Sequence, residues 1–167
     1  RKNAQNINSL QGKIISIDKT NKKFKIISKG HRNAQGLKIL SKEKKLLIST
    51  EHGPKGGDEV NIIDINQNLF TNNYGWPMAS YGIHYDVVPI NSFTNKYAPL
   101  KKNHAKYGFI EPIITFSPSV GISQIIEVKN NFINNKSHRT FAFGTMGKEI
   151  TKFMPSKSIF FISTDKD

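Results

Sequence analysis

Three polar, glycine-rich stretches hold the residue types of this chain that can do chemistry. They are residues 30–36 (GHRNAQG), 50–59 (TEHGPKGGDE) and 73–77 (NYGWP). Together they contain the first arginine after Arg1, the densest group of acidic residues and the single tryptophan of a chain that is otherwise rich in isoleucine, lysine and asparagine. Binding and catalytic residues are often carried by loops on a rigid scaffold. We therefore expect these stretches to form the functional site.

The first stretch is a polar turn between Gly30 and Gly36, where the backbone can come close to a ligand. The guanidinium of Arg32 carries five donors in a flat fork, which suits a carboxylate or an ortho-dicarbonyl group. Asn33 can both donate and accept. A turn in which Arg32 pairs with a neighbouring acid remains the alternative.

The second stretch combines Glu51, Asp58 and Glu59 with several glycines and one proline. Calcium prefers carboxylate and main-chain carbonyl oxygens, which glycine-rich loops expose. The spacing does not match the twelve-residue calcium loop of helix-loop-helix proteins, so an acidic hairpin turn stays open as an alternative. His52 has no second histidine at ligand spacing, and we do not predict it to bind a metal.

Short apolar runs between these stretches predict β-strands. Most are four to six residues long, β-branched and bounded by Gly, Asn, Lys or Pro, and no window keeps a helical apolar spacing for three turns. The pattern predicts an all-β sandwich, barrel or propeller. The predicted strands cover residues 13–17, 24–27, 37–40, 45–48, 60–63, 113–116, 124–128, 140–143, 149–153 and 158–162.

A weak internal repeat favours a propeller over a sandwich. Residues 36–50 and 121–145 each begin with glycine and an aliphatic strand, pass a Lys/Asn turn and return as a strand that ends in a small hydroxyl residue. Residues 81–106 show little strand pattern. A loop of that length in a compact fold is usually functional or a lid.

Composition limits the possible partners. A formal charge of +13 invites a nucleic-acid role, but arginine occurs only at Arg1, Arg32 and Arg139, and the lysines are scattered. We therefore predict no nucleic-acid partner. The absence of cysteine excludes disulfides and thiolate sites, and no apolar run reaches transmembrane length.

The ends of the sequence suggest a piece of a larger protein. The chain starts at Arg1 without a methionine and stops soon after the apolar run at residues 159–162. We expect a single partial domain over residues 1–167, with no separate second domain. Such a piece should expose unpaired strand edges.

The three stretches, in this order and spacing, strongly resemble the glucose/sorbosone dehydrogenase family of soluble, pyrroloquinoline-quinone-dependent aldose sugar dehydrogenases. Residues 4–14 (AQNINSLQGKI) also resemble the segment of that family that precedes these loops. The resemblance runs from about residue 1 to residue 148 and is most specific between residues 30 and 85. It implies a six-bladed β-propeller, of which this chain covers roughly the central half.

The resemblance also implies roles for individual residues and for the whole protein. Arg32, Asn33 and Tyr85 fall on positions that contact the quinone. Four residues match positions that hold Ca²⁺, two of them through a main-chain carbonyl pair: Gly53, Pro54, Glu59 and Tyr74. The implied partners are an aldose sugar and an external electron acceptor, and the implied location is periplasmic or secreted.

The sequence departs from the family at three points. The catalytic histidine of the family lies upstream of the segment that matches residue 1, so we predict no catalytic residue here and no turnover by this piece alone. Gly147 stands where the family usually has a lysine that contacts the cofactor, and Lys148 follows it. Ala34 replaces a proline that is common in the first stretch.

Two functions remain open at this level. The first is part of a quinoprotein that oxidises aldoses at the anomeric carbon, with hydride transfer to the quinone and assistance from calcium. The second is a calcium-binding propeller of the same family that serves as a binding module without redox activity.

Overall fold

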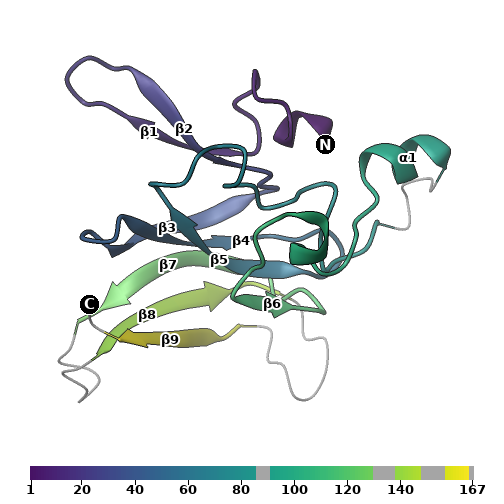
Figure 1. Ribbon diagram of the computed structural model, residues 1–167. Helices are drawn as coiled ribbons and strands as arrows, with labels where there is room; N and C mark the ends of the chain where they lie inside the picture. Colours follow the sequence, from purple (N-terminus) through teal and green to yellow (C-terminus); the bar gives the residue numbers. More distant parts are fainter. Residues whose placement is uncertain (86–90, 130–137, 148–156, 166–167) are drawn as a thin grey trace.

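The computed structural model describes residues 1–85, 91–129, 138–147 and 157–165, and within them the fold is almost entirely β (Figure 1). The strands form three antiparallel sheets, ordered β1-β2, β3-β4-β5-β6 and β7-β8-β9. Their bounds are β1 Lys13–Ile17, β2 Phe24–Lys29, β3 Ala34–Ser41, β4 Leu46–Glu51, β5 Asp58–Asp64, β6 Ile114–Phe116, β7 Ile122–Val128, β8 His138–Thr145 and β9 Ile159–Asp165.

The predicted strands agree closely with these elements. Nine of the ten predicted runs overlap an observed strand, and the tenth, residues 149–153, lies outside the described residues. The two repeats detected in the sequence are the hairpins β3-β4 and β7-β8, which begin two neighbouring sheets. The repeat therefore corresponds to one structural unit used twice.

Three short helices complete the fold: the 3₁₀ turns η1 (Lys2–Ala4) and η2 (Ala105–Tyr107) and the α-helix α1 (Ser92–Tyr97). The sequence did not predict α1, which lies in the region expected to be a loop. The side chain of its N-cap, Asn91, accepts a hydrogen bond from the main-chain N of Thr94 at 2.9 Å. At six residues, α1 is too short to leave a periodic apolar signal.

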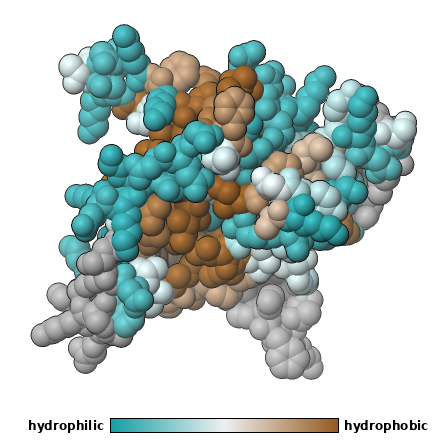
Figure 2. Space-filling model, viewed as in Figure 1, coloured by the Kyte–Doolittle hydropathy of each residue, from teal (hydrophilic) through white to brown (hydrophobic). Residues whose placement is uncertain are grey.

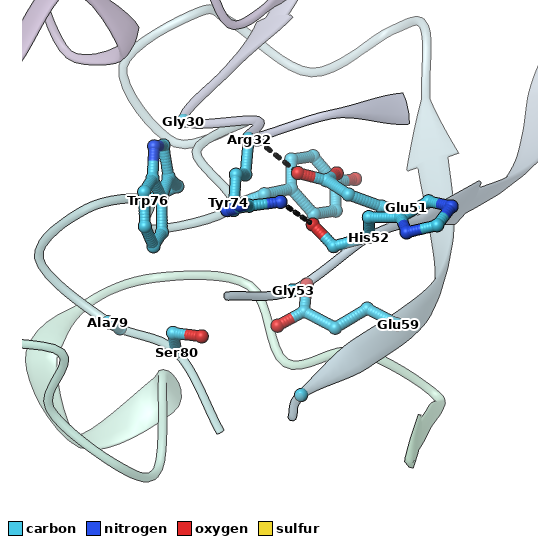
Figure 3. Close-up of a pocket in the computed structure, with 11 residues that line it drawn as sticks. Gly30, Arg32, Glu51, His52, Gly53, Glu59, Tyr74, Trp76, Ala79 and Ser80 are labelled. Carbon is cyan, nitrogen blue, oxygen red and sulfur yellow. Dashed lines mark hydrogen bonds between the residues drawn. The ribbon is translucent and has the colours of Figure 1, made fainter. Parts of the chain in front are cut away.

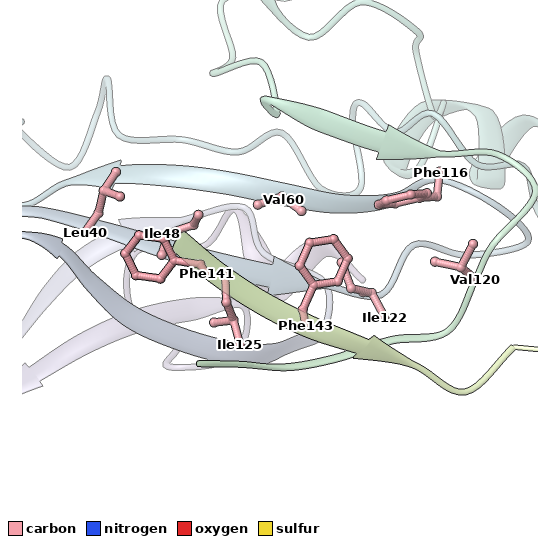
Figure 4. Close-up of a cluster of buried hydrophobic side chains, with 9 residues drawn as sticks. All are labelled: Leu40, Ile48, Val60, Phe116, Val120, Ile122, Ile125, Phe141 and Phe143. Atoms are coloured by element: carbon pink, nitrogen blue, oxygen red, sulfur yellow. The ribbon is translucent and has the colours of Figure 1, made fainter. Parts of the chain in front are cut away.

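The main core lies between the second and third sheets, which pack face to face (Figures 1 and 4). Ile48 and Val60 from the second sheet meet Phe141 and Phe143 from the third, and each of these side chains is at most 2% exposed. A hydrogen bond also crosses the interface: the Thr50 hydroxyl donates to the main-chain carbonyl of Ser123 at 2.6 Å. The two sheets are thus one packed body.

The strand β4 separates this core from the functional site. Because side chains alternate along a strand, Ile48 and Thr50 face the third sheet, whereas Ser49 and Glu51 face the opposite side. On that opposite side a smaller core of Ile14, Ile27, Ile63 and Tyr74 joins the first sheet to the second. The glycine-rich stretches meet beside this smaller core.

Within the described residues, β3 pairs only with β4 and β7 pairs only with β8. These strands leave hydrophobic side chains exposed, including Leu37, Ile39 and Ile126. Figure 2 shows hydrophobic side chains in a band across one face, between polar edges. The strand edges expected from the sequence are therefore present.

Candidate functional site

The three glycine-rich stretches line one hollow (Figure 3). It encloses about 220 Å³, including the open solvent at its mouth. It contains Arg32, Gly53, Glu59 and Tyr74, four of the seven residues proposed from the sequence as cofactor or metal contacts. The remaining lining residues are Gly30, Glu51, His52, Gly57, Trp76, Ala79 and Ser80.

Main-chain bonds hold the first and third stretches together. The amide of Tyr74 donates to the Lys29 carbonyl and that of Trp76 donates to the Gly30 carbonyl, each at 2.9 Å. The side chain of Gln5 then fastens the third stretch, because its amide donates to the Trp76 carbonyl at 2.7 Å. These bonds explain why residues forty positions apart share one wall of the hollow.

Arg32 lies across the upper part of the hollow. Its guanidinium carbon lies 5.4 Å from the centre of the Trp76 ring, and its Nη1 donates to the His52 carbonyl at 3.0 Å. That is the one hydrogen bond that its side chain makes to the described residues, so several of its five donors remain for a ligand. The alternative drawn from the sequence, an Arg32 side chain paired with an acid, is not what the structure shows.

Glu51 anchors this turn from below. Its Oε1 accepts from the main-chain amides of Arg32 and Asn33, the latter at 3.2 Å, and its Oε2 contacts His31 Nδ1 at 2.9 Å. Glu51 is one of the acids of the second stretch, and the sequence did not predict a site role for it. The strand alternation of β4 was the available signal, because it places Glu51 on the side opposite to Ile48.

Glu59 lies directly opposite Glu51 in the β4-β5 pairing, and both side chains are buried. Like charges at such positions destabilise a sheet. Burial, reinforced by the charge of Glu51, raises the pKa of Glu59 well above its ordinary value. The pair therefore favours a proton or a cation at Glu59.

Buried polar atoms around Glu59 lack partners. Its Oε2 accepts from Asn61 Nδ2 at 3.3 Å, but Asn61 Oδ1 and both ring nitrogens of His104 have no hydrogen bond in the structure. His104 Nε2 lies 3.6 Å from Glu59 Oε1. Burial lowers the pKa of His104. Such orphaned groups usually mark a missing water, ion or ligand.

His104 was not predicted as a site residue. It belongs to the segment between α1 and η2, where the sequence shows no periodic apolar pattern. The course of that segment in the fold brings it close to Glu59. Its second nitrogen lies 3.5 Å from Glu111 Oε2. Nothing in the local spacing could have indicated this approach.

The second glycine-rich stretch is held in a tight turn at Gly53. A Cβ added at Gly53 would collide with the carbonyl oxygens of Gly56 and Gly57, so no larger residue fits there. The Gly53 amide donates to Asp58 Oδ1 at 3.0 Å. Pro54 is buried next to this turn but does not line the hollow.

The oxygen-rich composition of the site suits a hard cation. The wall supplies the carboxylate of Glu59 and main-chain segments at Gly53 and Tyr74. In the part of the chain that the structure describes, no three His, Cys, Asp or Glu residues gather as a metal cluster. Carboxylate and carbonyl donors favour calcium over zinc or copper.

The other predicted contacts lie further out. Tyr85 is 45% exposed and does not line the hollow. Asn33 is exposed, and its side chain accepts from Gln35 at 3.0 Å. Gly147 does not line the hollow either, and Lys148 lies outside the described residues. The cofactor and metal roles of all seven residues stay predictions, for those that line the hollow and for those that do not.

Replacing Glu59 by glutamine tests whether this carboxylate needs a cation. Because the pKa of Glu59 is raised, its stabilising effect in chelated protein is complete below pH 4.5 and is lost as the pH rises through the raised value. We expect chelated Glu59→Gln protein to be more stable than the wild type at pH 8, with no such gain at pH 4. If calcium binds at Glu59, its affinity should fall about tenfold or more, because the amide removes the charge of a proposed ligand.

Thermal unfolding with EDTA and with calcium, at both pH values, measures these effects. Glu43→Gln provides the control, since Glu43 is exposed in the β3-β4 turn and should change neither quantity. Equal stability of the chelated wild-type and Glu59→Gln proteins at pH 8 would contradict the interpretation.

The packed antiparallel sheets, with a polar hollow beside them, define this chain as a stretch of β-propeller blades. Residues 1–159 match the family described as "Glucose / Sorbosone dehydrogenase". The chain belongs to this family of sugar dehydrogenases, and the predicted propeller fold is confirmed.

Characterised relatives support the assignment. The chain is 31% identical over 136 residues to aldose sugar dehydrogenase YliI of Escherichia coli (strain K12), covering 74% of this chain and 33% of that protein. It is 35% identical over 91 residues to quinoprotein glucose dehydrogenase B of Acinetobacter calcoaceticus, covering 47% and 18%. The chain thus spans a third or less of these relatives.

Solved structures give the same result. The crystal structure of the soluble aldose sugar dehydrogenase (Asd) from Escherichia coli, in its apo-form, superposes with a TM-score of 0.64 at 27% identity. The match covers 87% of this chain and 42% of that one. A glucose dehydrogenase crystal structure gives a TM-score of 0.64 at 29% identity, again over 87% and 42%.

Proposed function

We propose that this chain is part of a quinoprotein oxidoreductase that oxidises aldose sugars at the anomeric carbon, with hydride transfer to pyrroloquinoline quinone and assistance from Ca²⁺. The observation that carries the proposal is the convergence of Arg32 and Glu59 on one hollow, where Glu59 is also approached by buried polar atoms of Asn61 and His104 that have no hydrogen bond to the described residues. The relatives are sugar dehydrogenases, and one of them is a quinoprotein.

The residues present fit both groups. Arg32 has free donors above the hollow for the carboxylates or carbonyls of the quinone, with Asn33 and Tyr85 as further predicted contacts. The buried carboxylate of Glu59, whose pKa is raised by burial and by the charge of Glu51, fits a calcium ion, together with the carbonyls of Gly53, Pro54 and Tyr74. When bound, the ion would polarise a quinone carbonyl and the quinone would accept the hydride.

The side chains of this chain would bind and orient rather than abstract a proton. His31 is buried between Ser28 and Glu51. His52 contributes its carbonyl to Arg32, and Figure 3 shows its ring turned away from Trp76. The base that removes the anomeric hydroxyl proton would then come from the protein outside residues 1–167, as the resemblance implies.

A non-catalytic role has one observation in its favour. A Cβ added at Gly147 would lie 2.6 Å from the Val120 carbonyl oxygen, so the lysine usual in the family does not fit this backbone. A calcium-binding propeller without redox activity would tolerate that loss. Such a protein would hold calcium at Glu59 and still fail to oxidise a sugar.

We also propose an external electron acceptor and a periplasmic or secreted location, in keeping with the family. No helix among the described residues is long and apolar enough to cross a membrane.

The deciding experiment is dye reduction by the full-length protein. Reconstituted with calcium and pyrroloquinoline quinone, it should reduce a dye with an aldose, and either EDTA treatment or omission of the quinone should abolish the activity. Quinone binding without dye reduction for any aldose would favour the binding module. Absence of both would reject the quinoprotein assignment.

A further inference from the structure

A buried chain of hydrogen bonds that the proposed function does not use lies behind the hollow. The Ser28 hydroxyl lies 2.7 Å from His31 Nε2, and His31 Nδ1 lies 2.9 Å from Glu51 Oε2. All three residues are at most 3% exposed. One arrangement satisfies every group: Ser28 donates to Nε2, and Nδ1–H donates to the carboxylate.

The order hydroxyl, imidazole, carboxylate is also that of a nucleophilic triad. A nucleophile must reach its substrate, however, and Ser28 has no exposed surface and does not line the hollow. The geometry therefore serves something other than attack on a bound substrate.

The second carboxylate oxygen of Glu51 connects these hydrogen bonds to the turn that carries Arg32. Glu51 Oε1 accepts from the main-chain amides of Arg32 and Asn33, so one carboxylate joins the imidazole to the turn that carries the guanidinium. The His31 ring also stacks on Tyr74, with ring centres 4.6 Å apart and planes 23° apart. Contacts with Ser28, Glu51 and Tyr74 thus fix the orientation of the His31 ring.

We propose that His31 is a positioning residue, which orients Glu51 so that the Arg32 turn is already in place before a quinone binds. The inference rests on the proposed function. To the described residues the Arg32 side chain makes one hydrogen bond and one ring contact, with Trp76, so the backbone of its turn also sets where the guanidinium lies. Fixing that backbone in advance reduces the entropy lost when the ligand binds.

Two variants at this position separate the role from simple packing. In His31→Asn the amide nitrogen lies near the place of Nδ1 and can still donate to Glu51. In His31→Gln it lies near the place of Nε2 and reaches Ser28 instead. Both lose the ring that stacks on Tyr74. Quinone affinity is measured by calorimetry on the full-length protein with calcium present.

We expect His31→Asn to bind pyrroloquinoline quinone within about threefold of the wild type and His31→Gln to bind about tenfold or more weakly, the usual effect of losing an outer-shell partner. Their melting temperatures should be alike. Equal affinity in the two variants would overturn the proposal and leave His31 as a packing residue.

The controls separate a failure of the proposed function from a failure of the role of His31. If the wild type does not bind the quinone, the proposed function and the role of His31 fail together. If Arg32→Ala weakens binding but both His31 variants match the wild type, only the role of His31 fails. Should the variants not fold, the ¹⁵N spectrum of wild-type His31 decides: a proton on Nδ1 supports the proposal, whether or not Nε2 also carries one, and an Nδ1 without a proton overturns it.

Discussion

Replacing Asp58 by asparagine is expected to lower the free energy of unfolding by roughly 3 kcal/mol or more, which is the scale of losing hydrogen bonds to a charged acceptor. Asp58 is fully buried at the start of β5. Its Oδ1 accepts from the Gly53 amide at 3.0 Å and from the Ser119 hydroxyl at 2.7 Å. Its Oδ2 accepts from the amides of Val120 and Ile122, both at 3.1 Å.

Asparagine has the same shape but keeps one acceptor oxygen. Its NH₂ group would face two of the four donors and leave them unsatisfied in the interior. Because these donors belong to the turn at Gly53 and to the start of β7, we expect the variant to loosen both at once. If calcium binds as proposed, the stabilisation that it gives should shrink in parallel.

Urea denaturation with and without calcium measures both effects. Asp64→Asn is a matched control at the other end of β5, since Asp64 is only partly buried and accepts from the neighbouring amide of Asn66. Its effect should stay below about 1 kcal/mol. An unchanged urea midpoint for Asp58→Asn would show that the second and third sheets do not depend on this carboxylate.

Replacing Arg32 by alanine is expected to weaken binding of pyrroloquinoline quinone by tenfold or more. Charge-assisted hydrogen bonds contribute about 1.5–3 kcal/mol each, and a tenfold change in affinity corresponds to about 1.4 kcal/mol. The effect should appear as lost affinity with little change in melting temperature, because the Arg32 side chain makes one hydrogen bond to the described residues.

Two further variants sharpen this test. Arg139→Ala removes an arginine that pairs with Glu127 on the third sheet, away from the hollow, and should leave quinone affinity unchanged. Arg32→Lys keeps the charge but loses the flat fork, and should recover only part of the affinity. Binding by Arg32→Ala that equals the wild type would remove Arg32 from the cofactor site.

The β-strands could be predicted from sequence because their signal is local. Runs such as residues 60–63 are β-branched and bounded by polar or glycine residues, and each such run overlaps an observed strand where the structure describes it. The helix α1 could not be predicted in the same way. Its stability comes from the Asn91 cap, which leaves no apolar period.

Site residues that belong to contiguous motifs could be predicted from the sequence. Site residues that meet only because distant segments of the chain fold together could not. Arg32, Gly53, Glu59 and Tyr74 stand in recognisable stretches and do meet in one hollow. His104 reaches Glu59 from a segment more than forty residues away, and no local spacing encodes that contact. The direct opposition of Glu51 and Glu59 follows from the register of β4 with β5, which a motif alone does not specify.

The burial of both faces of β4 limits the changes of length that this strand can tolerate. Ile48 and Thr50 serve the interior while Ser49 and Glu51 serve the hollow, so inserting or deleting one residue would exchange the two sets. The exposed hairpin turns at residues 18–23 and 42–45 lie outside this constraint, so a one-residue change of length there would leave both sets of side chains on their own faces.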